Sequence, residues 1–324
     1  MFITILSLQR LTGGHLVANP FETPKALLRQ LFGFGFWMQI NSISAIINLE
    51  ADKLIIGRYL GVAEVAPYQV GGRLAMLTRA LPIQILTAMF PSITARVGER
   101  YDIAEMSDVY RSATRTLMLV TLVTVGFPIA VSSSLINVWI GYDPSAAASI
   151  AVALMISYSV NNATGVGTLI LRAIGLPKYE TIYAVCSAAM NIVITILLLP
   201  RFGIYGIVYG TICANVISLV GFIYFFHRVV RLDFSQTLFS WLKPLLFSVV
   251  TAALLIYGLD LVAMQSEPGR LSQLLIVGVL GVIYLAVVAE LLRQTKFWAS
   301  SDLSLLGRLG APGRWAIQRY APGL

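Results

Sequence analysis

The stretch Ile204–Phe226, with the sequence IYGIVYGTICANVISLVGFIYFF, contains no charged residue. A helix needs about 20 apolar residues to cross a hydrocarbon core of roughly 30 Å, and this stretch is long enough. Of the 324 residues, 57% are hydrophobic and 12% are charged, and the mean hydropathy is +0.80, so a water-soluble fold would expose large apolar patches. The sequence therefore predicts an all-α, polytopic membrane protein with about eight transmembrane helices. The predicted spans are Leu31–Glu50 (the helix running on to Leu60), Val65–Ala95, Leu117–Ile140, Ala147–Leu171, Ile182–Leu199, Ile204–Phe226, Leu245–Val262 and Leu274–Leu292.

The basic residues indicate how these spans are oriented. With the N-terminus assigned to one side of the membrane, that side collects 17 of the 23 Lys and Arg residues. The other side has only Arg58, Arg201 and Arg270. Loops that stay in the cytoplasm keep their Lys and Arg residues, so we expect both termini to be cytoplasmic. The net charge of +8 then lies in loops that meet anionic lipid headgroups, and we expect membrane lipid rather than nucleic acid as the partner.

We divide the chain into four parts. Residues 1–28 form a cytoplasmic N-terminal segment, residues 29–228 a bundle of six spans, residues 229–294 two additional spans, and residues 295–324 a basic cytoplasmic tail. The longest segments outside the spans are the two termini and Arg96–Thr116, and none is long enough to fold as a catalytic domain. No phosphate loop, HExxH or GxSxG motif or metal-ligand spacing is present, so we expect no catalytic residues, no metal and no cofactor.

Polar residues inside the first span follow one face of the helix. Asn41, Ser44, Asn48 and Asp52 recur at steps of three and four residues. Such a stripe either lines a cavity or joins helices through hydrogen bonds, and both readings stay open for Asn41 and Ser44. Glu50 forms an i,i+3 pair with Lys53, and a position at the membrane interface is the favoured reading for Glu50 and Asp52.

Two arginines follow in the second span. Counted back from Arg96, Arg73 lies near the outer boundary and Arg79 lies inside it. Arginine keeps its proton, so within lipid it needs a carboxylate, carbonyl groups, water or a ligand phosphate. We hypothesise that Arg73 pairs with Asp52 and that an anionic headgroup competes for this arginine. A purely structural pair is an equal alternative.

The fourth span carries a second polar stripe. Ser157, Asn161, Thr164 and Thr168 share one helical face, which Arg172 continues to the cytoplasmic end. Glycines lie beside this face, and small residues allow helices to approach closely, so helix packing is favoured over substrate contact here. The fifth and sixth spans have a weaker polar signal, which comes from Asn191, Thr195, Thr211 and Asn215.

Several motifs resemble one family in order and spacing, between about Ala26 and Phe226. The motifs are DKLIIGRYLG (Asp52–Gly61), VAPYQVGGR (Val65–Arg73), MFPSIT (Met89–Thr94), VWIG (Val138–Gly141), LRAIG (Leu171–Gly175) and LPRFGIYG (Leu199–Gly206). They are similar to the C-terminal part of oligosaccharide flippases of polysaccharide biosynthesis. These flippases lie within the multidrug/oligosaccharidyl-lipid/polysaccharide exporter superfamily. The resemblance implies a C-terminal six-helix lobe with two extra helices, and it implies that the chain is a fragment lacking the first lobe or pairs with another polypeptide.

The resemblance also implies a function. Such proteins flip polyprenyl-pyrophosphate-linked oligosaccharides across the bacterial inner membrane, without a cofactor and without catalysis. From the polar residues of the spans, the expected substrate-binding residues are Arg73, Arg79, Asn41, Asn48, Tyr68 and Asn161, and the candidates for ion coupling are Asp52 and Glu50. The resemblance implies Arg73, after Tyr68, as the pyrophosphate contact. A multidrug or lipid II type exporter, a membrane-embedded glycan enzyme and a scaffold for polysaccharide assembly proteins remain alternatives.

Overall fold

The computed structural model describes residues 25–99, 103–141, 145–230 and 270–294. The described residues form helices joined by short turns, which confirms the all-α prediction. In chain order the elements are α2 (Lys25–Tyr59), the 3₁₀ turn η2 (Val62–Glu64), α3 (Val65–Glu99), α4 (Ile103–Ile140), α5 (Ser145–Asn162), α6 (Gly165–Ala173), α7 (Pro177–Phe202), α8 (Ile204–Val230) and α10 (Arg270–Gln294).

Six helical stretches in the described part of the chain are long and apolar enough to cross a membrane. Helix α2 has 35 residues but is not among them, because the polar residues of its stripe lower its hydropathy. The predicted span Leu245–Val262 lies outside the described residues. The polytopic membrane fold is thus confirmed, while the count of eight spans stays a prediction. The stretches are Val62–Arg96, Glu105–Ile140, Ser145–Ala173, Pro177–Phe202, Ile204–Val230 and Ser272–Leu292.

Two helices differ in detail from the predicted spans. Helix α4 begins at Ile103, so most of the segment Arg96–Thr116, which was placed outside the spans, is helical. This extension has its own apolar face, on which Met106 and Tyr110 are buried in the core. The predicted fourth span lies within the apolar stretch Ser145–Ala173, but its helix is interrupted, because α5 ends at Asn162 and α6 begins at Gly165. The residues between them are tightened by i→i−3 bonds, from Ala163 N–H to the Val160 carbonyl and from Thr164 N–H to the Asn161 carbonyl.

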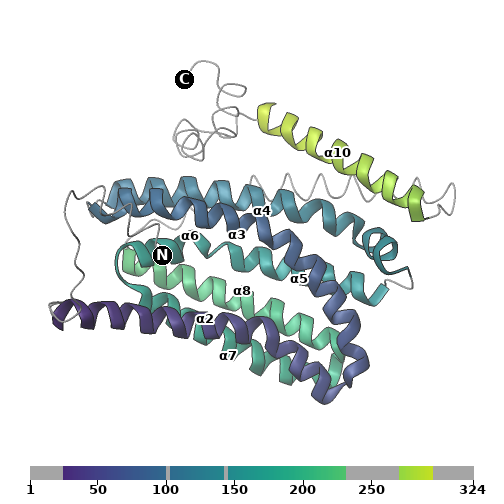
Figure 1. Ribbon diagram of the computed structural model, residues 1–324, viewed down its shortest axis with the longest axis horizontal. Helices are drawn as coiled ribbons and strands as arrows, with labels where there is room; N and C mark the ends of the chain where they lie inside the picture. Colours follow the sequence, from purple (N-terminus) through teal and green to yellow (C-terminus); the bar gives the residue numbers. More distant parts are fainter. Residues whose placement is uncertain (1–24, 100–102, 142–144, 231–269, 295–324) are drawn as a thin grey trace, which may run out of the picture.

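The arrangement of the helices follows from the turn that joins α2 to α3. Gly61 lies between α2 and η2 in the positive-φ region, with φ of 98°, which glycine adopts without a steric penalty. Beyond the turn the two helices diverge: α2 runs beside α7, and α3 crosses toward α4 and α5 (Figure 1). Helix α8 packs against both α5 and α7. The space between the diverging helices is therefore bounded by α5, α7 and α8.

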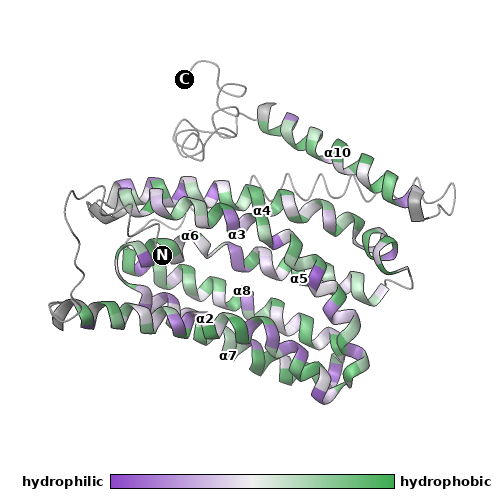
Figure 2. Cartoon of the chain, in the orientation of Figure 1, coloured by the Kyte–Doolittle hydropathy of each residue, from purple (hydrophilic) through white to green (hydrophobic). Residues whose placement is uncertain are grey.

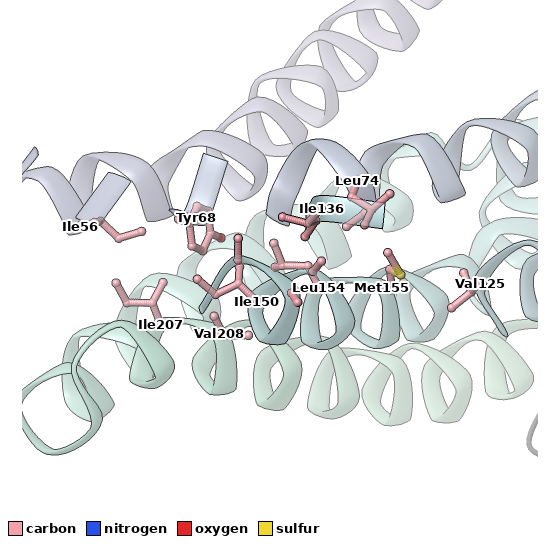
Figure 3. Close-up of a cluster of buried hydrophobic side chains, with 14 of the residues drawn as sticks. Ile56, Tyr68, Leu74, Val125, Ile136, Ile150, Leu154, Met155, Ile207 and Val208 are labelled. Atoms are coloured by element: carbon pink, nitrogen blue, oxygen red, sulfur yellow. The ribbon is translucent and has the colours of Figure 1, made fainter. Parts of the chain in front are cut away.

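Apolar cores hold the two ends of this bundle. One core lies near the α2–α3 turn and includes Ile56, Leu154 and Ile207 from three different helices (Figure 3). The other lies at the opposite end, where Phe222 and Phe226 stack and Tyr110 packs against them. Hydrophobic residues predominate along the helices (Figure 2), and many of their large side chains are exposed, among them Phe32, Leu54, Leu77 and Leu197. The polar residues of the spans are thus enclosed between two apolar clusters and an apolar surface.

Helix α10 packs along α4 at the edge of the bundle (Figure 1). Tyr284 is buried against Phe127, with ring centroids 5.6 Å apart, and its hydroxyl donates to the Val123 carbonyl at 3.0 Å. The Asn137 amide donates to Gln273 at 3.3 Å. Most of the other apolar side chains of α10 are exposed, as expected for a helix that faces lipid.

Close packing of α3 on α5 gives a first prediction. A Cβ atom at Gly71 would lie 2.5 Å from the carbonyl oxygen of Ala147 and 2.9 Å from the backbone nitrogen of Ala151. We expect Gly71→Ala to lower the free energy of unfolding by about 1–3 kcal/mol, because backbone atoms cannot move aside easily. Gly72→Ala is the matched control, since its Cβ would meet only Leu154 Cδ1 at 3.9 Å. Thermal unfolding in detergent would contradict the packing if both variants melted alike.

Candidate functional site

A cavity of about 210 Å³ lies in the space between the diverging helices. Its walls come from α2, α3, α5, α6, α7 and α8, and most of the lining side chains carry an amide, a hydroxyl or a charge. Because the surrounding helices are apolar, these groups meet the cavity instead of lipid. The polar lining residues are Asn41, Ser44, Asn48, Arg79, Tyr158, Asn161, Asn162, Thr164, Thr168, Glu180, Tyr183, Ser187, Thr211 and Asn215.

Arg79 is the cationic side chain in the wall of this cavity. One of its terminal nitrogens donates to the Asn161 Oδ1 at 3.1 Å, and its guanidinium lies over the Tyr158 ring, 5.0 Å from the centroid. Its Nε is buried without a hydrogen-bond partner. No carboxylate of the described residues lies within 4.0 Å of the guanidinium, so its charge is met only by an amide and an aromatic ring. Such a group favours an anionic ligand.

Asp52 is a buried carboxylate next to the cavity, with 2% of its surface exposed. It accepts hydrogen bonds from the Tyr68 hydroxyl at 2.7 Å, the Thr211 hydroxyl at 3.0 Å and the Asn191 amide at 3.4 Å. The same amide donates to Asn48 at 3.2 Å. Neutral donors from α3, α7 and α8 thus surround the carboxylate, which forms no ion pair with the described residues.

Glu180, the second buried carboxylate, has a different environment. It lines the cavity from the first turn of α7, and the Arg172 guanidinium donates to both of its oxygens. The Nε of Arg172 lies 2.6 Å from Oε2. The Asn41 amide adds a third hydrogen bond at 2.9 Å. Glu180 is therefore neutralised, and the cluster of Asn41, Arg172 and Glu180 joins α2, α6 and α7.

A second cavity, of about 150 Å³, continues the first toward the α2–α3 turn. Leu49 and Tyr158 line both cavities. The second cavity contains Arg73, which is exposed, together with Glu50 and Lys53, which form an ion pair at 2.6 Å. Tyr68 and Gln69 complete its polar lining.

The structure brings together most of the residues predicted from the sequence. Asn41, Asn48, Arg79 and Asn161 line the first cavity, and Tyr68 lines the second. Arg73 and Glu50 lie in the second cavity as well. The hypothesised ion pair between Asp52 and Arg73 is not formed. Instead, the hydroxyl of Tyr68, which precedes Arg73 on α3, donates a hydrogen bond to the Asp52 carboxylate. Arg73 is exposed.

Asp52 differs from its neighbours in its surroundings. Glu50 and Arg58 are exposed, but Asp52 is buried by α3, α7 and α8, and its depth in the membrane stays a prediction. The polar stripe of the fourth span, for which helix packing was favoured, divides between two roles. Ser157 bonds to Asn215 at 2.7 Å, whereas Asn161, Thr164 and Thr168 line the cavity.

Sequence reasoning did not single out Glu180, Tyr158 or Tyr183. Glu180 follows Pro177 at a helix start, where an acidic residue is common, so its pattern carried no functional signal. The two tyrosines lie within predicted membrane spans, where an aromatic ring is ordinary. Within the described residues, no group of three or more His, Cys, Asp or Glu side chains could hold a metal ion.

Fold and site together define a polytopic helical membrane protein with a polar cavity inside an apolar bundle. Comparisons with known proteins agree. Residues 19–149 match a family model described as "Polysaccharide biosynthesis protein". Over 81% of its length the chain superposes on the lipid II flippase MurJ in an inward closed conformation, covering 53% of that chain with a TM-score of 0.57 and 14% identity. The likeness shows a shared fold.

Curated relatives point to the same group. The chain is 21% identical over 272 residues to a probable low-salt glycan biosynthesis flippase of Haloferax volcanii, which covers 83% of this chain and 56% of the relative. It is 26% identical over 176 residues to a probable flippase of the same organism, covering 52% of this chain and 36% of the relative. An uncharacterized membrane protein of Methanocaldococcus jannaschii is 22% identical over 244 residues, which cover 74% of this chain and 46% of the relative.

The chain thus spans about half the length of the curated relatives it matches. The predicted resemblance to flippases of polysaccharide biosynthesis is confirmed by the family model, by the two named flippases and by the shared fold. These relatives are named as flippases and not as enzymes.

The ion pair between the half-buried Arg172 and the buried Glu180 gives a second prediction. Arg172→Gln leaves a buried carboxylate unpaired, so we expect it to lower the free energy of unfolding by about 3 kcal/mol. Replacing both partners, with Arg172→Gln and Glu180→Gln together, removes both charges and should recover much of that loss. Thermal unfolding of the two single variants and the double variant measures the coupling, and additive losses would contradict the pair.

Proposed function

We propose that this chain takes part in flipping polyprenyl-pyrophosphate-linked oligosaccharide repeat units across a membrane for polysaccharide biosynthesis. The observation that carries the proposal is the environment of Arg79. Arg79 lies on a helix that is long and apolar enough to cross a membrane, and its guanidinium lines the first cavity. The guanidinium has one neutral hydrogen-bond partner, Asn161, and its buried Nε has none. A pyrophosphate would supply the negative charge and the acceptor oxygens that this side chain lacks.

The rest of the bundle suits the other parts of such a substrate. Amide and hydroxyl groups of Asn41, Asn48, Asn161 and Thr168 line the cavity, and these groups can bind sugar hydroxyls. The exterior is apolar and compatible with a polyprenyl tail in the adjacent lipid. The two relatives named as flippases, one of glycan biosynthesis, support a lipid-linked glycan in general.

We further propose a location in a bacterial inner membrane with both termini cytoplasmic, on the basis of the distribution of Lys and Arg. The cavity lies in one six-helix bundle, whereas the relatives are about twice as long as the matched region. A complete translocation path therefore requires a second helical lobe. Another polypeptide, further sequence or polysaccharide assembly proteins around the chain would supply it.

Binding of a cation at Asp52 can supply the energy that is needed to release the substrate on the other side of the membrane. This buried carboxylate has only neutral donors around it, so a proton or a metal cation would offset its desolvation. Glu50 is the weaker candidate, because it is exposed and already paired with Lys53. We therefore assign coupling to Asp52.

The third prediction tests the anion site. In lipid nanodiscs, Arg79→Gln should weaken binding of an undecaprenyl-pyrophosphate-linked sugar by about tenfold or more, since hydrogen bonds to charged groups contribute about 1.5–3 kcal/mol. Arg58→Gln, at an exposed arginine outside both cavities, is the matched control and should bind like the unchanged chain.

Alternative functions give different outcomes in the same assay. A multidrug exporter that prefers cations would bind a lipophilic cation, and Arg79→Gln would not weaken that binding. A scaffold, or an enzyme that binds the lipid elsewhere, would bind the pyrophosphate lipid equally with and without Arg79. Either result would overturn the proposal, provided that thermal unfolding shows the variant to be folded.

The fourth prediction concerns coupling. In proteoliposomes of the transport-competent assembly, Asp52→Asn should remove the dependence of flipping on an imposed Na⁺ or pH gradient, because the amide keeps the shape of the side chain but has no charge. Glu50→Gln should keep that dependence. Gradient-dependent flipping by the Asp52→Asn variant would show that this carboxylate is not the coupling site.

A further inference from the structure

The two cavities share one wall, which comes from a single face of α3. Gln69, Gly72 and Met76 line the second cavity, and Arg79, Ile83 and Leu86 line the first. These residues are spaced three and four apart, so they form one continuous stripe along the helix. Leu49 and Tyr158 are common to both linings, so the two cavities lie next to each other, the second nearer the α2–α3 turn.

The chemistry differs between the two cavities. In the first cavity Arg79 has no carboxylate partner among the described residues, and the carboxylate of Glu180 is bound by Arg172. In the second cavity both charges are present: Glu50 lies beside Lys53, and Arg73 and Gln69 are close by. The positive charges of Lys53 and Arg73 are thus partly offset by Glu50, whose carboxylate can accept hydrogen bonds from hydroxyl groups.

We infer that the second cavity binds the first sugar of the lipid-linked substrate, while Arg79 in the first cavity binds the pyrophosphate. A sugar hydroxyl both donates and accepts, so it can use the carboxylate of Glu50, the amide of Gln69 and the guanidinium of Arg73 together. The rings of Tyr68 and Tyr158, with Leu49 and Leu154, supply the flat apolar surface on which the C–H face of a sugar ring packs.

The spacing of the two subsites fits this assignment. Arg73 and Arg79 are six residues apart, which corresponds to a rise of about 9 Å along a helix. That is comparable to the separation between a pyrophosphate and the far side of the hexose attached to it. The inference rests on the proposed function, and it moves Arg73 from the pyrophosphate contact that the sequence predicted to a contact with the sugar.

Two ligands separate the subsites. The full chain in nanodiscs is titrated with undecaprenyl pyrophosphate and with the same lipid carrying one N-acetylglucosamine. Arg73→Gln should weaken binding of the glycosylated lipid by about fivefold to tenfold and leave the unglycosylated lipid within about twofold, as expected for the loss of one sugar contact. Gln69→Ala should show the same preference with a smaller effect. Arg79→Gln should weaken both lipids alike, and Arg201→Gln, an exposed arginine outside both cavities, should change neither.

The outcomes distinguish this inference from the proposed function. Equal weakening of both lipids by Arg73→Gln would make Arg73 a second phosphate contact and overturn the sugar subsite. Unchanged binding of both lipids in Arg73→Gln and Gln69→Ala would overturn it as well, while a weakened Arg79→Gln variant would leave the proposed function intact. If Arg79→Gln binds both lipids normally, the proposed function itself fails.

Discussion

A guanidinium enclosed by membrane-spanning helices has to be met by other polar groups, and this requirement organises the centre of the bundle. Arg79 is met only by Asn161 and the face of Tyr158, so part of its hydrogen-bonding capacity is unused. A side chain that keeps its proton and lacks a counter-ion is costly in an apolar bundle. The polar cavity around it is the consequence, because amide and hydroxyl groups from α2, α5, α6, α7 and α8 turn inward to the same space.

The sequence predicted the helices and the polar stripes well, because both depend on local periodicity. Asn41, Ser44 and Asn48 line the cavity, which is one of the two interpretations that the sequence allowed for this stripe. Asp52 lies on the same side of α2. The partners of Asp52 could not be predicted in the same way. Its contacts with Asn191 and Thr211 join residues 139 and 159 positions apart, and only the packing of α2 on α7 and α8 brings them together.

Helix ends were predicted less well, for two physical reasons. Hydropathy identifies where lipid begins but not where a helix begins, so the amphipathic start of α4 was assigned to a loop. Between α5 and α6 the sequence contains no proline, and the interruption arises from tight backbone bonds at Ala163 and Thr164. The position of this turn beside the cavity, with Asn161, Thr164 and Gly165 in the lining, places irregular backbone where polar groups surround it.

The two carboxylates near the cavity have different partners. Glu180 is bound by Arg172 and Asn41, which makes it part of the scaffold that joins three helices. Asp52 has only neutral partners, and one of them, Thr211, also lines the cavity that contains Arg79. The bundle thus carries an unpaired negative group and an unpaired positive group on the same polar centre. A cation at Asp52 would reduce the negative potential there and favour an anion at Arg79, and thermodynamic linkage makes this effect reciprocal. Substrate and ion binding are therefore expected to be coupled through electrostatics, even where no side chain contacts both ligands.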